Sequence, residues 1–302
     1  EAIITHGVYT QLTCFFCSVI NEIQNGPVSE THKRLVDQTK DSDLFITFNW
    51  DTLLDRVLCE KGLMDLESGY GFFPHEIFRD GWIAPSKGNE EKAKLIKLHG
   101  STNWITSYPG LDPKTKEPYL LQSTSNDTVR IFEFATKPYS CYEGRYMGKY
   151  APFSLGYYPP NILSDKGKPP EKDHVFIKAR MKHPFIPEGI AGKEGLPTIP
   201  LIIPPVKNKQ YDFFGGLFLN LWNRAKEAIA KAEYIYLIGY SFPMTDVKTI
   251  ELFKASFLQR KTYPRIVIIN PDTERIEELL SFEFGIPKSY IEVKRQYFSG
   301  EL

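Results

Sequence analysis

The sequence predicts an α/β fold, in which a parallel sheet carries helices on both of its faces. Short and almost wholly apolar runs such as "DLFITFN", "EYIYLIGYS" and "RIVIINP" are typical of parallel strands that are buried on both faces. Longer segments with apolar residues at helical spacing follow or precede these runs. Strands that alternate with helices along the chain indicate a parallel sheet.

The N-terminal part contains two amphipathic helices, then a strand, a helix and a second strand. We expect these elements at residues 8–24, 31–40, 43–49, 51–62 and 95–100. The run "NGPVSE" has the composition of a turn and separates the first two helices. Gly62 follows the last periodic residue of its helix, which is the position that glycine favours at a helix end.

The C-terminal part repeats the alternation three times, each time as a helix followed by a strand. We expect these elements at residues 217–232, 233–241, 247–260, 265–271, 272–285 and 291–298. Asp272 is expected to cap its helix. Asp246 stands where another helix begins, and the sequence leaves open whether it is only a cap or belongs to a site.

Between residues 106 and 205 the alternation of strands and helices disappears. The segment is dense in Pro, Gly and Tyr, as in "SLGYYPPNILSDKGKPPEKD", and predicts turns and extended pieces. Its aromatic content argues against disorder. We therefore expect a small inserted lobe at 106–205, and a sheet domain formed by 1–105 and 206–302. The lobe is expected to cover a ligand cleft, and the alternative is a surface for subunit assembly.

Composition and charge exclude two classes of partner. Lys+Arg and Asp+Glu both total 37, so the formal net charge is zero and the basic surplus that is typical of duplex binding is absent. No apolar run has the length of a membrane span, and the N-terminal residues do not have the pattern of a signal peptide. The sequence predicts a globular cytoplasmic protein with no direct nucleic-acid or membrane partner.

The cysteines do not have the spacing of a zinc site. The chain has four cysteines, and only the pair in "CFFC" is close in sequence. That pair lies in an apolar helical pattern, so we expect its thiols in the core. The prediction is that the protein holds no metal.

Polar residues follow several predicted strands at the point where each strand ends. The runs are 49–51, 99–101, 239–241 and 269–271. In open parallel sheets, ligands bind outside the carboxyl ends of the strands. The sequence therefore predicts one ligand site built from these four runs.

The runs "FNWDTLLDRV", "LHGSTNW" and "LIGYSFPMTD", followed by "INP", resemble the ordered motifs of the sirtuins. They are most similar to the sirtuin-like NADase domains of bacterial antiphage defence systems. The similarity covers about residues 40–105 and 200–290. It implies a Rossmann-like domain that binds NAD as its substrate. It also implies a hydrolase that depletes NAD during phage defence, acting as a homo-oligomer or with a partner defence protein.

The resemblance implies a role for each motif residue. Asn49 would position the nicotinamide ribose and a water molecule, and His99 would act on the ribose hydroxyls, so these two are the expected catalytic residues. The expected NAD-binding residues are Asp51 at the carboxamide, Ser101 in the histidine run, Gly239 and Ser241 at the phosphates, and Asn270 at the adenosine ribose.

Three features depart from the sirtuin pattern. Phe48 stands where the family has Gln, and no zinc ribbon follows His99. The family's Gly-rich phosphate loop is not found before Asn49. Either residues upstream of Glu1 complete that loop or the nucleotide pocket is incomplete.

The residue types also suit cleavage of the nicotinamide–ribose bond. That reaction passes through an oxocarbenium-like ribose, which needs an oriented water and a base near the hydroxyls. The amide of Asn49 can donate and accept hydrogen bonds without charge, and His99 titrates near neutrality. The alternatives are an NAD-dependent protein deacylase, which the absent zinc ribbon disfavours, and a non-catalytic module that senses NAD or ADP-ribose.

Overall fold

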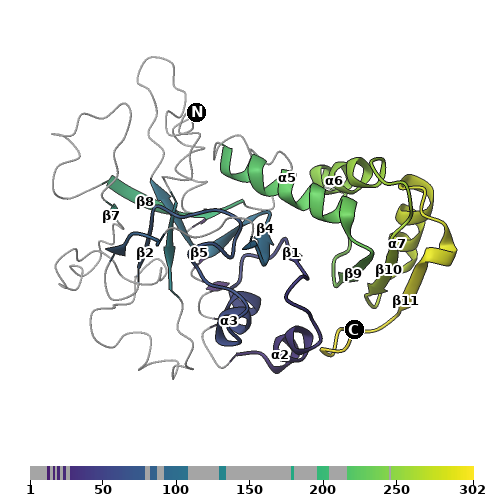
Figure 1. Cartoon of the computed structure of the whole chain (residues 1–302), viewed down its shortest axis with the longest axis horizontal. Helices are drawn as coiled ribbons and strands as arrows, with labels where there is room; N and C mark the ends of the chain where they lie inside the picture. Colours follow the sequence, from purple (N-terminus) through teal and green to yellow (C-terminus); the bar gives the residue numbers. More distant parts are fainter. Residues whose placement is uncertain are drawn as a thin grey trace, which may run out of the picture. The chain divides into compact units, whose positions relative to one another are not determined.

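The structure is a computed structural model, and it describes residues 12–13, 16–17, 19–20, 23–24, 28–78, 82–86, 92–107, 129–133, 178–179, 196–203, 216–244 and 246–302 (Figure 1). The chain divides into two compact units, each of which is described by itself. The first unit comprises Glu1–Ser29, Phe45–Pro205 and Lys209–Leu219. The second comprises Glu30–Leu44, Val206–Asn208 and Asn220–Leu302.

The first unit contains a pair of parallel strands, β1 (Phe45–Thr47) and β4 (Leu95–Lys97). Helix α3 (Leu53–Glu60) follows β1, and Gly62 after it adopts a φ of +69°. This left-handed backbone favours glycine and ends the helix as predicted. Before β1, the described residues between 12 and 24 are helical, as expected for the first predicted helix.

A mixed sheet of six strands forms the rest of the first unit, in the order β3-β2-β6-β5-β8-β7. Its strands are β2 (Glu76–Phe78), β3 (Trp82–Ile83), β5 (Gly100–Ser107), β6 (Arg130–Phe132), β7 (Lys178–Ala179) and β8 (Leu196–Ile202). The ring of Trp104 makes edge contacts with Tyr70 and Phe72, at centroid distances of 5.0 and 4.9 Å, and is fully buried. Much of the predicted insert 106–205 lies outside the described residues, including most of its Pro-rich and Tyr-rich runs.

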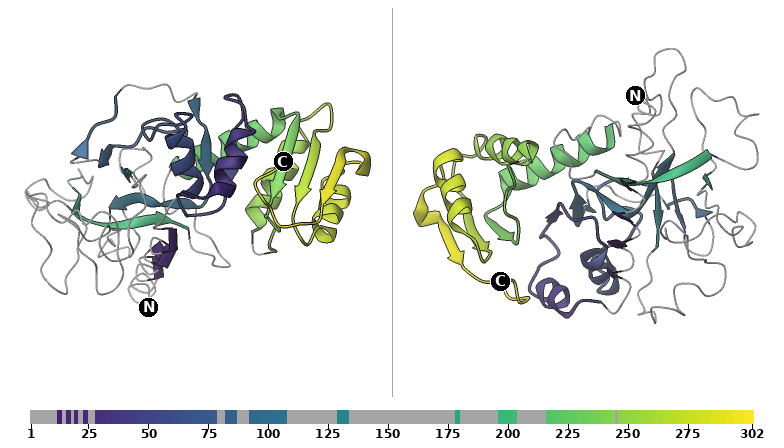
Figure 2. Two further views of the ribbon diagram at one scale, coloured as in Figure 1. Left: turned by 90° about the horizontal axis from the view of Figure 1, so that it is seen from below. Right: turned by 180° about the vertical axis from the view of Figure 1, so that it is seen from behind.

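The second unit contains three parallel strands in the order β11-β10-β9 (Figure 2). The strands are β9 (Tyr234–Ile238), β10 (Arg265–Ile269) and β11 (Ile291–Lys294). The helices are α2 (Glu30–Asp37), α6 (Val247–Phe257), α7 (Glu274–Glu278) and most of α5 (Gly216–Lys231). This order confirms the predicted alternation of helices and strands in the C-terminal part.

The prediction that Asp272 is the N-cap of the last helix is wrong by one residue. The N-cap of α7 is Thr273, and no side chain bonds to the helix from that position. The amide of Asp272 instead donates to Oδ1 of Asn270 at 3.0 Å. This local bond bends the chain before the helix begins, so Asp272 lies in the turn and does not cap the helix.

The coarser prediction of a fold that mixes helices and strands is confirmed, and parallel strands occur in both units. Most pairings of the six-stranded sheet are antiparallel, which the sequence did not predict. The parallel strands form a two-stranded group in the first unit and a three-stranded group in the second. Their union in one Rossmann-like sheet stays a prediction. Within the described ranges, no helix is long and apolar enough to cross a membrane.

Candidate functional site

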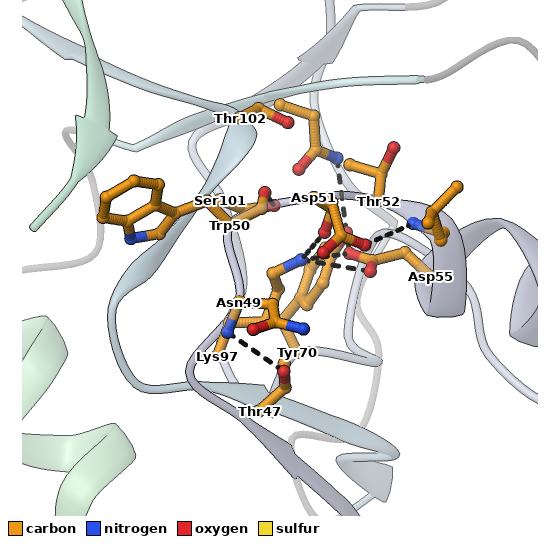
Figure 3. Close-up of polar contacts among 12 residues, drawn as sticks. Thr47, Asn49, Trp50, Asp51, Thr52, Asp55, Tyr70, Lys97, Ser101 and Thr102 are labelled. Atoms are coloured by element: carbon orange, nitrogen blue, oxygen red, sulfur yellow. Dashed lines mark hydrogen bonds and ion pairs between the residues drawn. The ribbon is translucent and has the colours of Figure 1, made fainter. Parts of the chain in front are cut away.

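The loop 48–52 joins β1 to α3 and carries Asn49 and Asp51 (Figure 3). The backbone amide of Asn49 donates to Oγ1 of Thr47 at 3.1 Å, and the residue is exposed. Asp51 is half-buried, and its Oδ1 accepts the amide of Leu53 at 3.0 Å. The first amides of a helix lack partners within the helix, so this bond gives Asp51 a structural role at the start of α3.

His99 and Ser101 lie beside this loop, because β1 and β4 are paired in parallel and end at the same edge. The ring of His99 is 5.3 Å from that of Phe48, and only 7% of His99 is exposed. Ser101 is fully buried, and its hydroxyl donates to the backbone carbonyl of Trp50 at 3.4 Å. The structure thus brings the predicted runs 49–51 and 99–101 together.

A buried polar network lies under the loop, and it joins residues that no local sequence pattern connects. Nζ of Lys97 is 3.1 Å from both carboxylate oxygens of Asp55 and also donates to the backbone carbonyl of Asp51 (Figure 3). The hydroxyl of Tyr70 donates to Oδ1 of Asp55 at 2.6 Å, and Nδ2 of Asn103 donates to that hydroxyl at 3.3 Å. The one available signal was a lysine inside the apolar run "LIKLHG".

Burial changes the acidity of this network. It raises the pKa of the Asp55 carboxyl, and the charge of Lys97 opposes that rise. The pKa of Tyr70 is raised well above its ordinary value, first by burial and then by the Asp55 carboxylate. Both shifts follow from the exclusion of water from charged groups.

The Tyr70 shift predicts an alkaline instability that depends on this hydroxyl. A folded-state pKa above the unfolded value of about 10 contributes stability that is complete below pH ~10 and lost as the pH rises further. We expect Tyr70→Phe to cost about 2 kcal/mol at pH 8, because the hydrogen bonds of this hydroxyl to Asp55 and from Asn103 are both lost. Between pH 9.5 and 11 its unfolding free energy should fall less steeply than that of the wild type. Urea unfolding across this range checks the slope, and equal slopes would contradict the assignment.

A second polar junction joins the loop to the N-terminal segment. Oε1 of Gln24 accepts the amide of Thr52 at 2.6 Å, and Nε2 of Gln24 donates to Oγ1 of Thr102 at 3.1 Å. The amide of Thr102 donates to the carbonyl of Trp50 at 2.9 Å. The loop is therefore held on two sides by neutral hydrogen bonds, in addition to Lys97.

Three predicted NAD-binding residues lie in the second unit, after β9 and β10. Gly239 is exposed, has a φ of +66°, and its amide donates to the carbonyl of Ile269 at 2.9 Å. Apart from its chain neighbours, none of the residues that the structure describes has an atom within 4 Å of the position that a Cβ of Gly239 would take. Ser241 is exposed, whereas Asn270 is buried with its side chain bonded to the amide of Asp272.

The turn between β9 and α6 is held by aromatic side chains. Phe242 has a φ of +49°, and its buried ring lies 5.1 Å from that of Phe253. Such a backbone is rare for a bulky residue and persists where the surroundings hold it. Asp246 occupies the N-cap of α6, but its carboxylate accepts the hydroxyl of Tyr240 at 2.7 Å and makes no cap bond.

The two groups of predicted site residues belong to different units: Asn49, Asp51, His99 and Ser101 to the first, and Gly239, Ser241 and Asn270 to the second.

Among the described residues, no cluster of three or more His, Cys, Asp or Glu side chains could hold a metal ion. Cys17 is fully buried, as expected of a core thiol, while Cys14 and Cys141 lie outside the described residues.

No protein-family model, curated protein or solved structure matches this chain.

Proposed function

We propose that the chain is an NAD⁺ hydrolase that releases nicotinamide and ADP-ribose. The observation that supports it most is the meeting of the Asn49 and His99 loops at the ends of the parallel strands β1 and β4. In the reaction, the bond between C1′ and the nicotinamide nitrogen breaks, and its electron pair leaves with nicotinamide. A water oxygen then bonds to C1′, and one proton is released.

Asn49 suits the role of placing the attacking water. Its side chain is exposed on a loop whose flanking backbone groups are hydrogen-bonded, so its Cα is held while its amide faces solvent. A neutral amide can accept from the water and donate to the ribose without capturing the cationic carbon. Preorganised dipoles of this kind stabilise charge that develops in the transition state.

His99 suits the role of the base near the ribose hydroxyls. Its backbone carbonyl accepts the amide of Ile203 at 2.9 Å, and its ring lies against that of Phe48. These contacts fix where the imidazole lies. A neutral imidazole can take a proton from a hydroxyl and return it.

The residues proposed to contact the phosphates and the adenosine ribose lie in the second unit. The open space beside Gly239 lets a phosphate approach the backbone, and helix α6 offers its N-terminal amides. Ser241 would add a hydroxyl at the phosphates, and Asn270 an amide at the adenosine ribose. Asp51 and Ser101 would complete the nicotinamide end.

The biological role proposed for this activity is antiphage defence in the cytoplasm. The resemblance of the motif series to the sirtuin-like NADases of defence systems supports this role. An enzyme that depletes NAD harms its own cell, so its activity needs a control. We propose assembly into a homo-oligomer, or contact with a partner defence protein, as that control.

A non-catalytic NAD or ADP-ribose sensor is the second candidate. The observation that favours it is the structural use of Asp51 and Ser101, whose side chains bond to backbone groups. A sensor would need Gly239, Ser241 and Asn270 but not the solvent-facing amide of Asn49.

Chromatography of the products separates these functions. The full chain is incubated with NAD alone, and in parallel with NAD and an acetyl-lysine peptide. A hydrolase forms nicotinamide and ADP-ribose without the peptide, whereas a deacylase forms an acetylated ADP-ribose only with it. Binding of NAD without any product would overturn the proposed activity in favour of the sensor.

Metal removal is expected to leave the reaction unchanged. The cysteine spacing does not fit a zinc site, so the proposed chemistry uses protein groups and water. We predict less than a twofold change in turnover after dialysis against EDTA. Loss of activity that zinc restores would contradict this expectation.

A further inference from the structure

We infer that the buried pair Lys97–Asp55 is a positioning device for the loop that carries Asn49. This inference rests on the proposed function, because it assigns the pair an effect on turnover. Neither side chain is proposed to touch the substrate. Both act through the backbone of Asp51, two residues beyond Asn49.

Each of the three N–H donors of the Lys97 ammonium has a protein oxygen as its acceptor. Nζ has three donors, and the structure gives it three acceptors: the two carboxylate oxygens of Asp55 and the carbonyl of Asp51. The side chains of Lys97 and Asp55 are each 1% exposed. The ammonium therefore ties helix α3 and strand β4 to the loop between β1 and α3.

The free energy of folding alone does not explain why a charged pair is buried at this place. Removing two charges from water costs free energy that their attraction repays only in part, and well-packed apolar side chains would often serve as well. An apolar side chain at residue 97, however, could not donate to the carbonyl of Asp51. The hydrogen bond to the loop is the property of Lys97 that an apolar core would lack.

The surrounding residues hold the pair in one arrangement. The hydroxyl of Tyr70 donates to Oδ1 of Asp55 at 2.6 Å and accepts from Asn103 on strand β5. The carboxylate is thus oriented by Tyr70, whose hydroxyl is in turn bonded by Asn103 of the six-stranded sheet. The oriented carboxylate of Asp55 holds the ammonium of Lys97 in place, and the ammonium holds the backbone carbonyl of Asp51.

The test replaces the pair by neutral side chains of similar size, as Lys97→Met combined with Asp55→Asn. The asparagine keeps an acceptor for Tyr70 and leaves no unpaired charge. We expect kcat for NAD hydrolysis to fall about 10- to 100-fold with KM within threefold, because small displacements of a catalytic group cost rate. Hydrogen exchange at the amides of 49–53 should become faster.

A matched control removes another ion pair in the same unit, in which the arginine is buried and the glutamate partly exposed. Nε of Arg130 is 2.7 Å from Oε2 of Glu76, and the side chain of Arg130 is 1% exposed. Arg130→Met combined with Glu76→Gln should change neither kcat nor exchange at 49–53. If both neutralised pairs lower kcat equally, the effect is one of general stability and the inference is overturned.

Three further outcomes also decide the test. If the Lys97–Asp55 variant does not fold, Tyr70→Phe provides the same test with a smaller change, and its kcat should fall two- to tenfold. Unchanged kcat and unchanged exchange in a folded variant would overturn the inference. If the wild type hydrolyses no NAD, the proposed function fails, and the exchange rates at 49–53 still decide whether the pair holds the loop.

Discussion

Replacing Asn49 by Ala is expected to lower NAD turnover by at least ~100-fold. The side chain is exposed, so its removal should change the free energy of unfolding by less than about 0.5 kcal/mol. The amide would otherwise place the water and stabilise the cationic ribose, and alanine can do neither. Turnover is measured by chromatography and stability by urea unfolding.

Asn220→Ala is the matched control for this substitution. Asn220 is also exposed and lies in helix α5, away from the loop 48–52 in sequence. Its replacement should leave both turnover and stability close to those of the wild type. A folded Asn49→Ala protein with near wild-type turnover would remove Asn49 from the proposed catalytic residues.

Replacing Gly100 by Ala is expected to cost more than about 4 kcal/mol of unfolding free energy, or to prevent folding. Gly100 has a φ of +80°, and a Cβ there would lie 2.1 Å from the carbonyl oxygen of Leu201. That oxygen belongs to strand β8, which pairs with β5 at this point, with Gly100 opposite Ile202. The clash is therefore between two backbones that cannot separate without losing the sheet.

Gly62→Ala separates the steric clash from backbone strain. Gly62 has a similar φ of +69°, but in the part of the chain that the structure describes, no atom beyond its chain neighbours lies within 4 Å of its Cβ position. Only the left-handed backbone is penalised there, at about 1–2 kcal/mol. Urea unfolding of the two variants measures the difference, and equal losses would show that the close approach of β5 and β8 is not present in solution.

Local patterns in the sequence were sufficient to predict most helices and parallel strands. The helix expected at 247–260 occurs as Val247–Phe257, and the strand expected at 265–271 as Arg265–Ile269. Spacing along the chain determines such elements, because each buries one stripe or run of apolar residues. The pairing of β5 with β8 was not predicted, since the partner strand begins almost ninety residues after Ser107.

The candidate site could be predicted only in part for the same reason. That Asn49 and His99 each follow a strand was predictable, because a polar residue after an apolar run marks a strand end. The pairing of β1 with β4 came only from the structure. The network under the loop was not predictable, since Lys97 is far in sequence from Asp55 and Tyr70. Burial of Ser101 also depends on a contact with Trp50 that no local pattern encodes.

The most direct test of the proposed activity is NAD cleavage in water enriched in ¹⁸O, followed by mass spectrometry of the products. The proposed hydrolysis transfers one water oxygen to C1′, so ADP-ribose sampled before its anomeric oxygen exchanges should carry one ¹⁸O. Nicotinamide should form in equal amount without any acyl peptide. NAD that binds but stays intact over the same time course would contradict the assignment of this chain as an NAD⁺ hydrolase.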